Sequence, residues 1–132
     1  MHLVVGGLLA IVAAPTLRAH HSFAAEFDVN KPVTLTGGVT RLEWANPHIW
    51  VYLDVKDDQG TTHWQCEGGA PNTLTRNGWS KTSLKMDDQV TVIGWLARDG
   101  SKTCNIRVLT MPDGRSVLAG SAGGEIPALP KK

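Results

Sequence analysis

Apolar and polar residues alternate along most of residues 33–119, and this period of two is typical of β-strands. The pair Gly37–Gly38 interrupts the first alternating segment and predicts a bulge or a sharp bend within that strand. A short helix is expected over residues 72–76, with Asn72 as its capping residue. The alternation as a whole predicts strands over residues 33–44, 48–55, 61–67, 89–97 and 102–110, with a brief further strand over 115–119.

The order of these elements is three strands, a short helix, and then two or three more strands. A long, bent first strand and a helix between the third and fourth strands are features of a five-stranded Greek-key barrel of the OB type. An immunoglobulin-like sandwich is the alternative all-β fold, but it needs about seven strands and has no place for the helix. The predicted fold class is therefore all-β with one short helix, a five- to six-stranded OB-like Greek-key barrel over residues 33–119.

The second and third strands are expected to form a hairpin across the turn at residues 57–60. If Val55 lies opposite Thr62, Val51 lies opposite Cys66 on the core face. The same register leaves a row of aromatic and polar side chains on the outer face. Aromatic rings at this place in an OB barrel stack on flat or sugar-like ligands. The candidate ligand-binding residues are therefore Trp50, Tyr52, Gln65 and Glu67.

A different arrangement would hide part of that face. Phe23 and Phe27 are two aromatic residues in an otherwise polar N-terminal arm, residues 20–32, and they need an apolar surface to cover. One alternative is that they pack over Trp50 and remove it from solvent.

The first residues of the chain are expected to lie outside the folded domain. Residues 3–14 form an apolar run that is shorter than the roughly 20 residues a transmembrane helix needs, and Pro15 follows it. This pattern predicts a signal peptide over residues 1–19, cleaved between Ala19 and His20, and hence a periplasmic or secreted protein. The alternative is a buried hydrophobic helix. At the other end, residues 120–132 are rich in Gly, Ala and Pro and are predicted to be disordered.

The chain has two cysteines, Cys66 and Cys104, and no spacing between them that suits a zinc site or a redox motif. On neighbouring strands in an oxidising compartment they can form a disulfide. Closing a loop of this length is worth roughly 3–4 kcal/mol in the chain-entropy treatment. The alternative is a pair of unpaired, buried cysteines that act as small apolar residues.

Charge and length exclude several function classes. Thirteen Lys and Arg residues against 12 Asp and Glu give a net charge of +1, which argues against sequence-independent nucleic-acid binding. A chain of 132 residues has no room for separate cofactor and substrate domains. Glu43, Asp54 and Glu67 are isolated carboxylates on predicted strands, and no phosphate-binding loop or catalytic triad is present.

Cleavage after Ala19 would create a possible copper ligand set at the new N-terminus. A free α-amine and the imidazole of His20 can chelate one metal ion, and His21 adds a second ring. Such nitrogen ligands suit Cu(II) or Ni(II). His48 is a further candidate ligand if the arm folds back on the second strand. The candidate metal ligands are therefore His20, His21 and His48.

Five segments together resemble a known family, and they lie in residues 20–28, 44–48, 67–72, 76–79 and 94–101. The chain is similar in these segments to small exported bacterial proteins classified as a domain of unknown function, number 6152. The resemblance covers residues 20–121 and implies export and a small barrel-like β domain. It implies no reaction and no ligand, and the two cysteines are not part of it.

The expected function is that of an exported, non-enzymatic β-barrel module that binds a small ligand or a periplasmic protein partner. The alternative is a periplasmic copper-binding protein that uses the N-terminal histidines, and copper is then its cofactor. A copper-dependent oxidoreductase is a third, more distant alternative. Neither nucleic acid nor a transmembrane segment after signal cleavage is expected.

Overall fold

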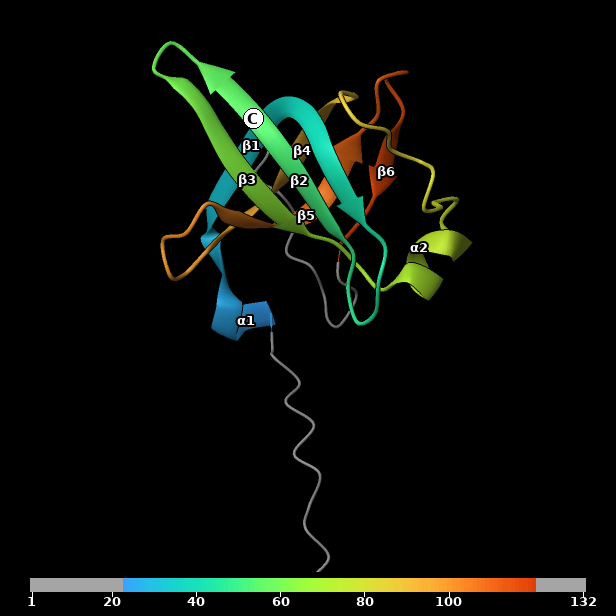
Figure 1. The fold of residues 1–132 in the computed structure, drawn as a ribbon. Helices are drawn as coiled ribbons and strands as arrows, with labels where there is room; N and C mark the ends of the chain where they lie inside the picture. The colour runs from blue at the N-terminus through green and yellow to red at the C-terminus, as the bar shows by residue number, and fades with distance from the viewer. Residues whose placement is uncertain (1–22, 121–132) are drawn as a thin grey trace, which may run out of the picture.

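The computed structural model describes residues 23–120 and forms a closed β-barrel with two short helices (Figure 1). The predicted signal peptide, His20, His21 and residues 121–132 of the predicted tail lie outside the described residues. The elements in chain order are α1 (Phe23–Glu26), β1 (Phe27–Glu43), β2 (Trp50–Asp57), β3 (Gly60–Glu67), α2 (Pro71–Arg76), β4 (Gln89–Ala97), β5 (Thr103–Thr110) and β6 (Ser116–Leu118).

The long strand β1 belongs to both sides of the barrel. Its first part pairs with β4 and its second part pairs with β2, both antiparallel. The change of partner occurs at Gly37–Gly38, where a Cβ on Gly37 would lie 2.4 Å from the backbone oxygen of Asp54. Glycine is needed here because the backbone of β2 occupies the space of a side chain. The predicted bend at this glycine pair is therefore confirmed.

A parallel pairing between β3 and β5 closes the barrel. The ring of hydrogen-bonded strands then runs β1–β2–β3–β5–β4 and back to β1, and β6 extends it from β5. This order, with α2 between β3 and β4, is that of an OB-like Greek-key barrel. The predicted fold class is confirmed.

The disulfide partners lie at this closure. Cys66 on β3 is the register partner of Cys104 on β5, with 4.6 Å between their Cα atoms and their sulfur atoms at disulfide distance. Both side chains are fully buried. The pairing joins residues 38 positions apart, so it ties together the two strands that the local sequence pattern does not connect.

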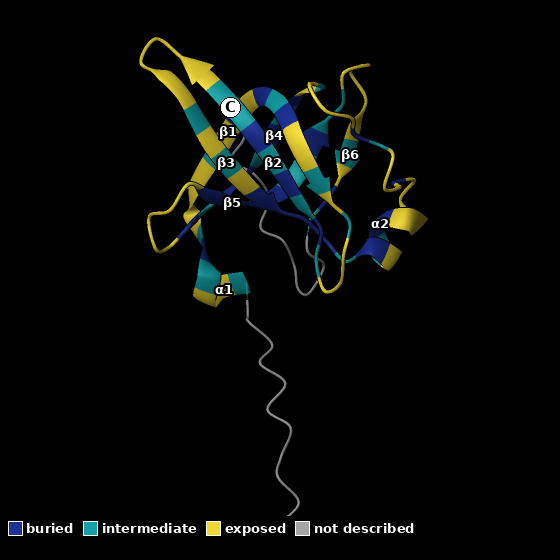
Figure 2. Cartoon of the chain, in the orientation of Figure 1, coloured by how far each residue is buried: buried dark blue, intermediate teal, exposed yellow. Residues whose placement is uncertain are grey.

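The barrel encloses one main apolar core, and α2 with the segment after it covers one end. Trp79 is 2% exposed and packs into this core. Figure 2 shows the buried residues along the strands and the exposed tip of the β2–β3 hairpin. The largest buried aliphatic side chains of this core are Ile49, Leu53, Leu74, Ile106, Leu109, Val39, Val51, Val90 and Val92.

A second, smaller apolar cluster corrects the expectation about the N-terminal arm. Phe23 packs edge-on against Trp95 with 5.4 Å between ring centroids, and it contacts Phe27 at 5.5 Å. The suggestion that these phenylalanines cover Trp50 is therefore wrong. The reason is that β1 begins at Phe27 rather than at Val33, and its register with β4 brings Phe27 beside Ala97 and the Trp95 side chain.

Two element boundaries also differ from the sequence expectation. The helix α2 begins at Pro71, in the first helical position that proline favours, and Ala70 rather than Asn72 precedes it as the N-cap residue. Strand β2 begins at Trp50 rather than His48. Ile49 instead exchanges backbone hydrogen bonds with Gly68 and Gly69, which ties the loop before β2 to the segment after β3.

Within residues 23–120, no helix has the length and apolar character that crossing a bilayer requires.

Candidate ligand-binding site

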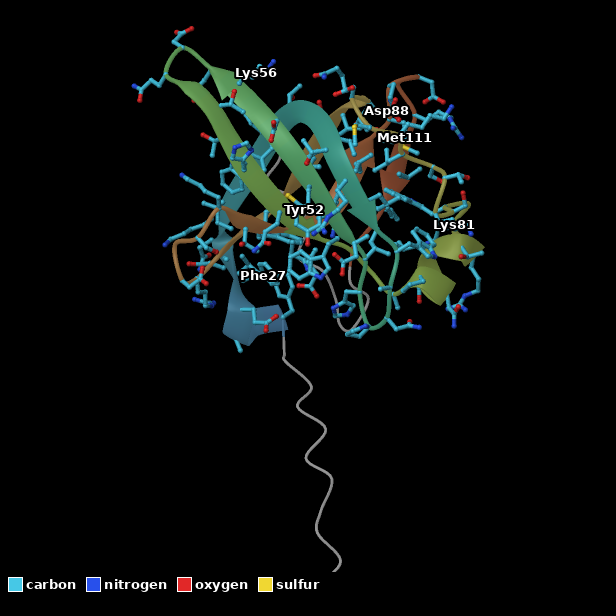
Figure 3. All side chains as sticks on the ribbon, in the orientation of Figure 1. Phe27, Tyr52, Lys56, Lys81, Asp88 and Met111 are labelled. Carbon is cyan, nitrogen blue, oxygen red and sulfur yellow. A yellow bond between two sulfur atoms is a disulfide. The ribbon has the colours of Figure 1, made fainter. Side chains whose placement is uncertain are left out.

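The predicted register of the β2–β3 hairpin is confirmed, and it builds one polar and aromatic face on the outside of the barrel. Tyr52 lies opposite Gln65, and Trp50 lies opposite Glu67. The parallel pairing extends both rows onto β5, because Thr103 is the partner of Gln65 and Asn105 is the partner of Glu67. The four residues predicted to bind a ligand therefore form two adjacent rows on the same face. Figure 3 shows the side chains on the ribbon, with Tyr52 labelled.

The first row lines a shallow hollow of about 230 Å³. Gln65 donates its amide N–H to the Thr103 hydroxyl at 2.9 Å, and the Ser101 hydroxyl donates to the same oxygen at 2.8 Å. Three connected polar side chains thus lie beside aromatic rings at one place. The residues that line the hollow are Tyr52, His63, Trp64, Gln65, Ser101, Lys102 and Thr103.

Two cations lie over aromatic rings that line the hollow. The Arg41 guanidinium is 3.9 Å from the centre of the Tyr52 ring, and the Lys102 ammonium is 5.4 Å from the centre of the Trp64 ring. Arg41 also forms an ion pair with Glu43 at 3.3 Å. Glu43 in turn accepts a hydrogen bond from the Tyr52 hydroxyl at 3.3 Å. Arg41 is therefore already neutralised by a carboxylate.

Lys102 differs from Arg41 in its partners. Among residues 23–120, no carboxylate lies within ion-pair distance of Lys102. The carboxylates near the hollow accept other hydrogen bonds, since Asp54 pairs with His63 and Asp99 accepts the Ser101 backbone N–H at 2.9 Å. The hollow therefore has an unpaired positive charge at its rim.

The second row is closed rather than open. The Glu67 side chain is only 7% exposed, and its Oε1 atom pairs with Nδ1 of His48. Burial raises the pKa of the Glu67 carboxyl, and the negative charge of Glu26 raises it further. Pairing with His48 and a hydrogen bond from Asn105 act in the opposite direction. The carboxylate of Glu67 is thus occupied by protein partners.

Comparison with known proteins identifies the family of this chain. A model of the family described as "Family of unknown function (DUF6152)" matches residues 8–106. The chain belongs to this family. No curated protein matches the chain.

In this DUF6152 protein, the predicted ligand-binding residues separate into two groups. Tyr52 and Gln65 line the hollow, whereas Glu67 is buried against His48 and Trp50 is half-buried outside the lining. The separation follows from burial, because the loop that contains His48 covers the Glu67 end of the face. We therefore locate the open part of the candidate site at Tyr52 and Gln65.

The predicted metal ligands fall partly outside the described residues. Of the three histidines, only His48 is described, and residues 23–120 contain no group of three or more His, Cys, Asp or Glu side chains placed to hold a metal ion. Pairing of Nδ1 with Glu67 leaves Nε2 as the other ring nitrogen of His48. The His48 side chain as a whole is 37% exposed.

Sequence reasoning missed several residues of the hollow in the DUF6152 chain. His63 lines the hollow with a side chain that is 81% exposed. Trp64 was expected only on the core face, and it packs against the core while it also lines the hollow. Ser101, Lys102 and Thr103 were expected in or next to a hairpin turn. The predicted disulfide contained the missing signal, because pairing Cys66 with Cys104 places Gln65 beside Thr103.

Proposed function

We propose that this protein is an exported, non-enzymatic binding module whose outer barrel face holds a small ligand or one group of a larger partner. The observation that carries the proposal is the hollow beside Tyr52, where ring faces, an amide, hydroxyls and an ammonium group converge. Aromatic faces combined with a few placed polar groups are the usual composition of a small-molecule site.

The volume of the hollow limits what it holds. At about 230 Å³ it is smaller than the roughly 300–1,000 Å³ of most small-molecule pockets. A single ring-sized group therefore fits, and the remainder of a larger ligand would extend into solvent along the face. This size supports recognition of one unit of a longer molecule.

Two features support export. The apolar residues 3–14 followed by Pro15 suit a signal peptide. Cys66 and Cys104 lie at disulfide distance, and disulfides persist in the periplasm and outside the cell.

Nuclear magnetic resonance titration tests this proposal. We expect galactose, galacturonate or 4-hydroxybenzoate to shift the backbone amide signals of Gln65 and Thr103, because these residues lie on two sides of the hollow. Tyr52→Ala should weaken the binding about tenfold through loss of a ring face. Leu118→Ala on β6 is the matched control, since Leu118 is an exposed apolar residue that does not line the hollow. Absence of shifts around the hollow with all three probes would contradict the proposal.

Copper binding is the second candidate function, and the His48–Glu67 pair favours it. A histidine that ligates a metal usually gives its other ring N–H to a carboxylate, which orients the ring. Nδ1 of His48 has such a partner in Glu67. In addition, α1 begins three positions after His20 in the sequence, and the charge of Glu26 in α1 influences Glu67.

Copper titration of the processed protein tests this candidate. Mass spectrometry should first establish that the exported chain begins at His20. Copper(II) should then bind the wild type at least about tenfold more tightly than His20→Ala or His48→Ala. His63→Ala is the matched control because His63 is exposed and pairs with a different carboxylate, Asp54. Equal, weak affinity in all four proteins would reject a specific copper site.

A further inference from the structure

Lys102 gives the hollow a chemical preference that its aromatic residues alone would not have. The ammonium group lies at the rim and contacts the Trp64 ring, and no carboxylate among the described residues pairs with it. A cation over a ring face retains most of its charge, because the ring contributes only a weak quadrupole. A negative group that enters the hollow therefore meets an uncompensated positive charge.

Two carboxylates near the hollow form hydrogen bonds with other groups and are not ion-pair partners of Lys102. Asp54 accepts a hydrogen bond from His63, which lines the hollow on the side of the β2–β3 hairpin tip. Asp99 accepts the Ser101 backbone N–H within its own turn. Each carboxylate thus has a local donor, whereas the Lys102 ammonium has the Trp64 ring and no carboxylate as its partner within residues 23–120. The asymmetry favours an anionic ligand at the Lys102 side of the hollow.

The other walls define the shape of that ligand. Tyr52 and Trp64 present aromatic surface, and Gln65 lines the same hollow with an amide oxygen and a second N–H beyond its bond to Thr103. A planar or chair-shaped ring can pack on the aromatic surface while its hydroxyl groups bond the amide. A negative substituent on such a ring then points to Lys102.

We infer that the hollow binds a six-membered ring that carries a carboxylate, with the ring against Tyr52 and Trp64 and the carboxylate at Lys102. The inference rests on the proposed binding function and specifies its ligand class. Two sources share this chemistry, a uronic acid unit of an acidic polysaccharide and an aromatic acid such as a hydroxybenzoate. The small volume accommodates one such ring.

Calorimetric titration with pairs of probes that match in shape and differ in charge tests the inference. The acids are galacturonate and 4-hydroxybenzoate, and their neutral counterparts are galacturonate methyl ester and 4-hydroxybenzamide. We expect at least one acid to bind the wild type about tenfold more tightly than its neutral counterpart. The acid that binds more tightly identifies the source. Glutarate, an acyclic dicarboxylate, should bind more weakly than that acid because it has no ring to pack.

Substitutions of Lys102 distinguish the loss of its positive charge from a general disruption of the hollow. Lys102→Gln should remove the preference for the acid, and Lys102→Arg should preserve it because the charge remains. Lys81→Gln is the matched control, since Lys81 is an exposed lysine outside the hollow, labelled beside the α2 segment in Figure 3. It should leave the affinity unchanged. The salt dependence of acid binding should fall in Lys102→Gln.

The outcomes distinguish this inference from the proposed function. If acids and neutral counterparts bind the wild type equally well, the charge preference is overturned and the binding function stands. Equal binding of glutarate and the ring acids would overturn the ring contact. If none of the five probes binds the wild type, both the inference and the ring-sized binding site on which it rests are overturned.

Discussion

Removal of the disulfide should produce the largest loss of stability of any change at the barrel closure. The double variant Cys66→Ala/Cys104→Ala should unfold with a free energy of unfolding lower by roughly 3–4 kcal/mol, because the cross-link restrains a 38-residue separation in the unfolded chain. The missing disulfide would weaken the one parallel pairing of the described barrel, where β3 and β5 share three register pairs. Urea denaturation followed by tryptophan fluorescence measures the change.

A comparison with reduced wild type separates the contribution of the covalent bond from that of the packing of the two cysteine side chains. Both cysteine side chains are fully buried, so alanine also leaves a small cavity. Wild type that is unfolded, reduced and refolded in reductant retains both side chains and lacks only the bond. We expect it to lose most of the stability that the double variant loses. Equal midpoints for oxidised wild type and the double variant would show that the cross-link contributes nothing.

Gly94→Ala should be the most damaging glycine-to-alanine substitution in the strands. An added Cβ would lie 1.8 Å from the backbone oxygen of Asn105, so β4 and β5 would have to separate. The register of these strands shifts between Ile93 and Gly94, which brings the two backbones into this close approach. We expect the free energy of unfolding to fall by about 3 kcal/mol, at the upper end of the range for overpacked positions. Thermal or urea unfolding measures it.

Gly38→Ala is the matched control for that substitution. Gly38 is also a strand glycine, but a Cβ there would meet the amide end of the flexible Gln89 side chain at 3.0 Å rather than backbone. The side chain can move aside, so the change should be less than about 1 kcal/mol. If both alanine variants lose the same stability, the close backbone approach at Gly94 is not the cause.

Gly94→Ala also connects the fold to the candidate site. Asn105 on β5 is the register partner of Trp95 on β4 and of Glu67 on β3, so a displaced β5 would move the wall that bears Thr103. The ligand binding that we propose for the hollow requires β5 to stay at its position beside β3. A variant that folds with separated strands should therefore lose binding even though no residue of the hollow is changed.

Local patterns were enough to predict the β2–β3 hairpin in detail. Alternation from Trp50 to Val55 excludes a slip of one residue, which would expose the apolar face, and the short turn favours the observed register over a slip of two. The same reasoning placed Tyr52 opposite Gln65. Strand β4 agreed with its predicted bounds, residues 89–97, for the same reason.

Local patterns failed where a residue's partner lies far away in sequence. Nothing in the alternation around Phe23 and Phe27 indicates whether Trp50 or Trp95 lies beneath them, because the choice depends on where β1 starts to pair with β4. Glu67 was predicted to be an open ligand-binding residue for a similar reason. Its burial depends on the loop with His48, which closes over that row only in the folded barrel.

The sequence by itself determined the order of the strands along the chain and the outer position of Tyr52 and Gln65, since these follow from periodicity and from the short turn between β2 and β3. Only the tertiary structure decided that Lys102 and Thr103 complete the hollow and that Glu67 does not. The physical reason is barrel closure: the parallel contact between β3 and β5 joins segments 38 positions apart, and no local pattern of apolar residues encodes a pairing over that separation.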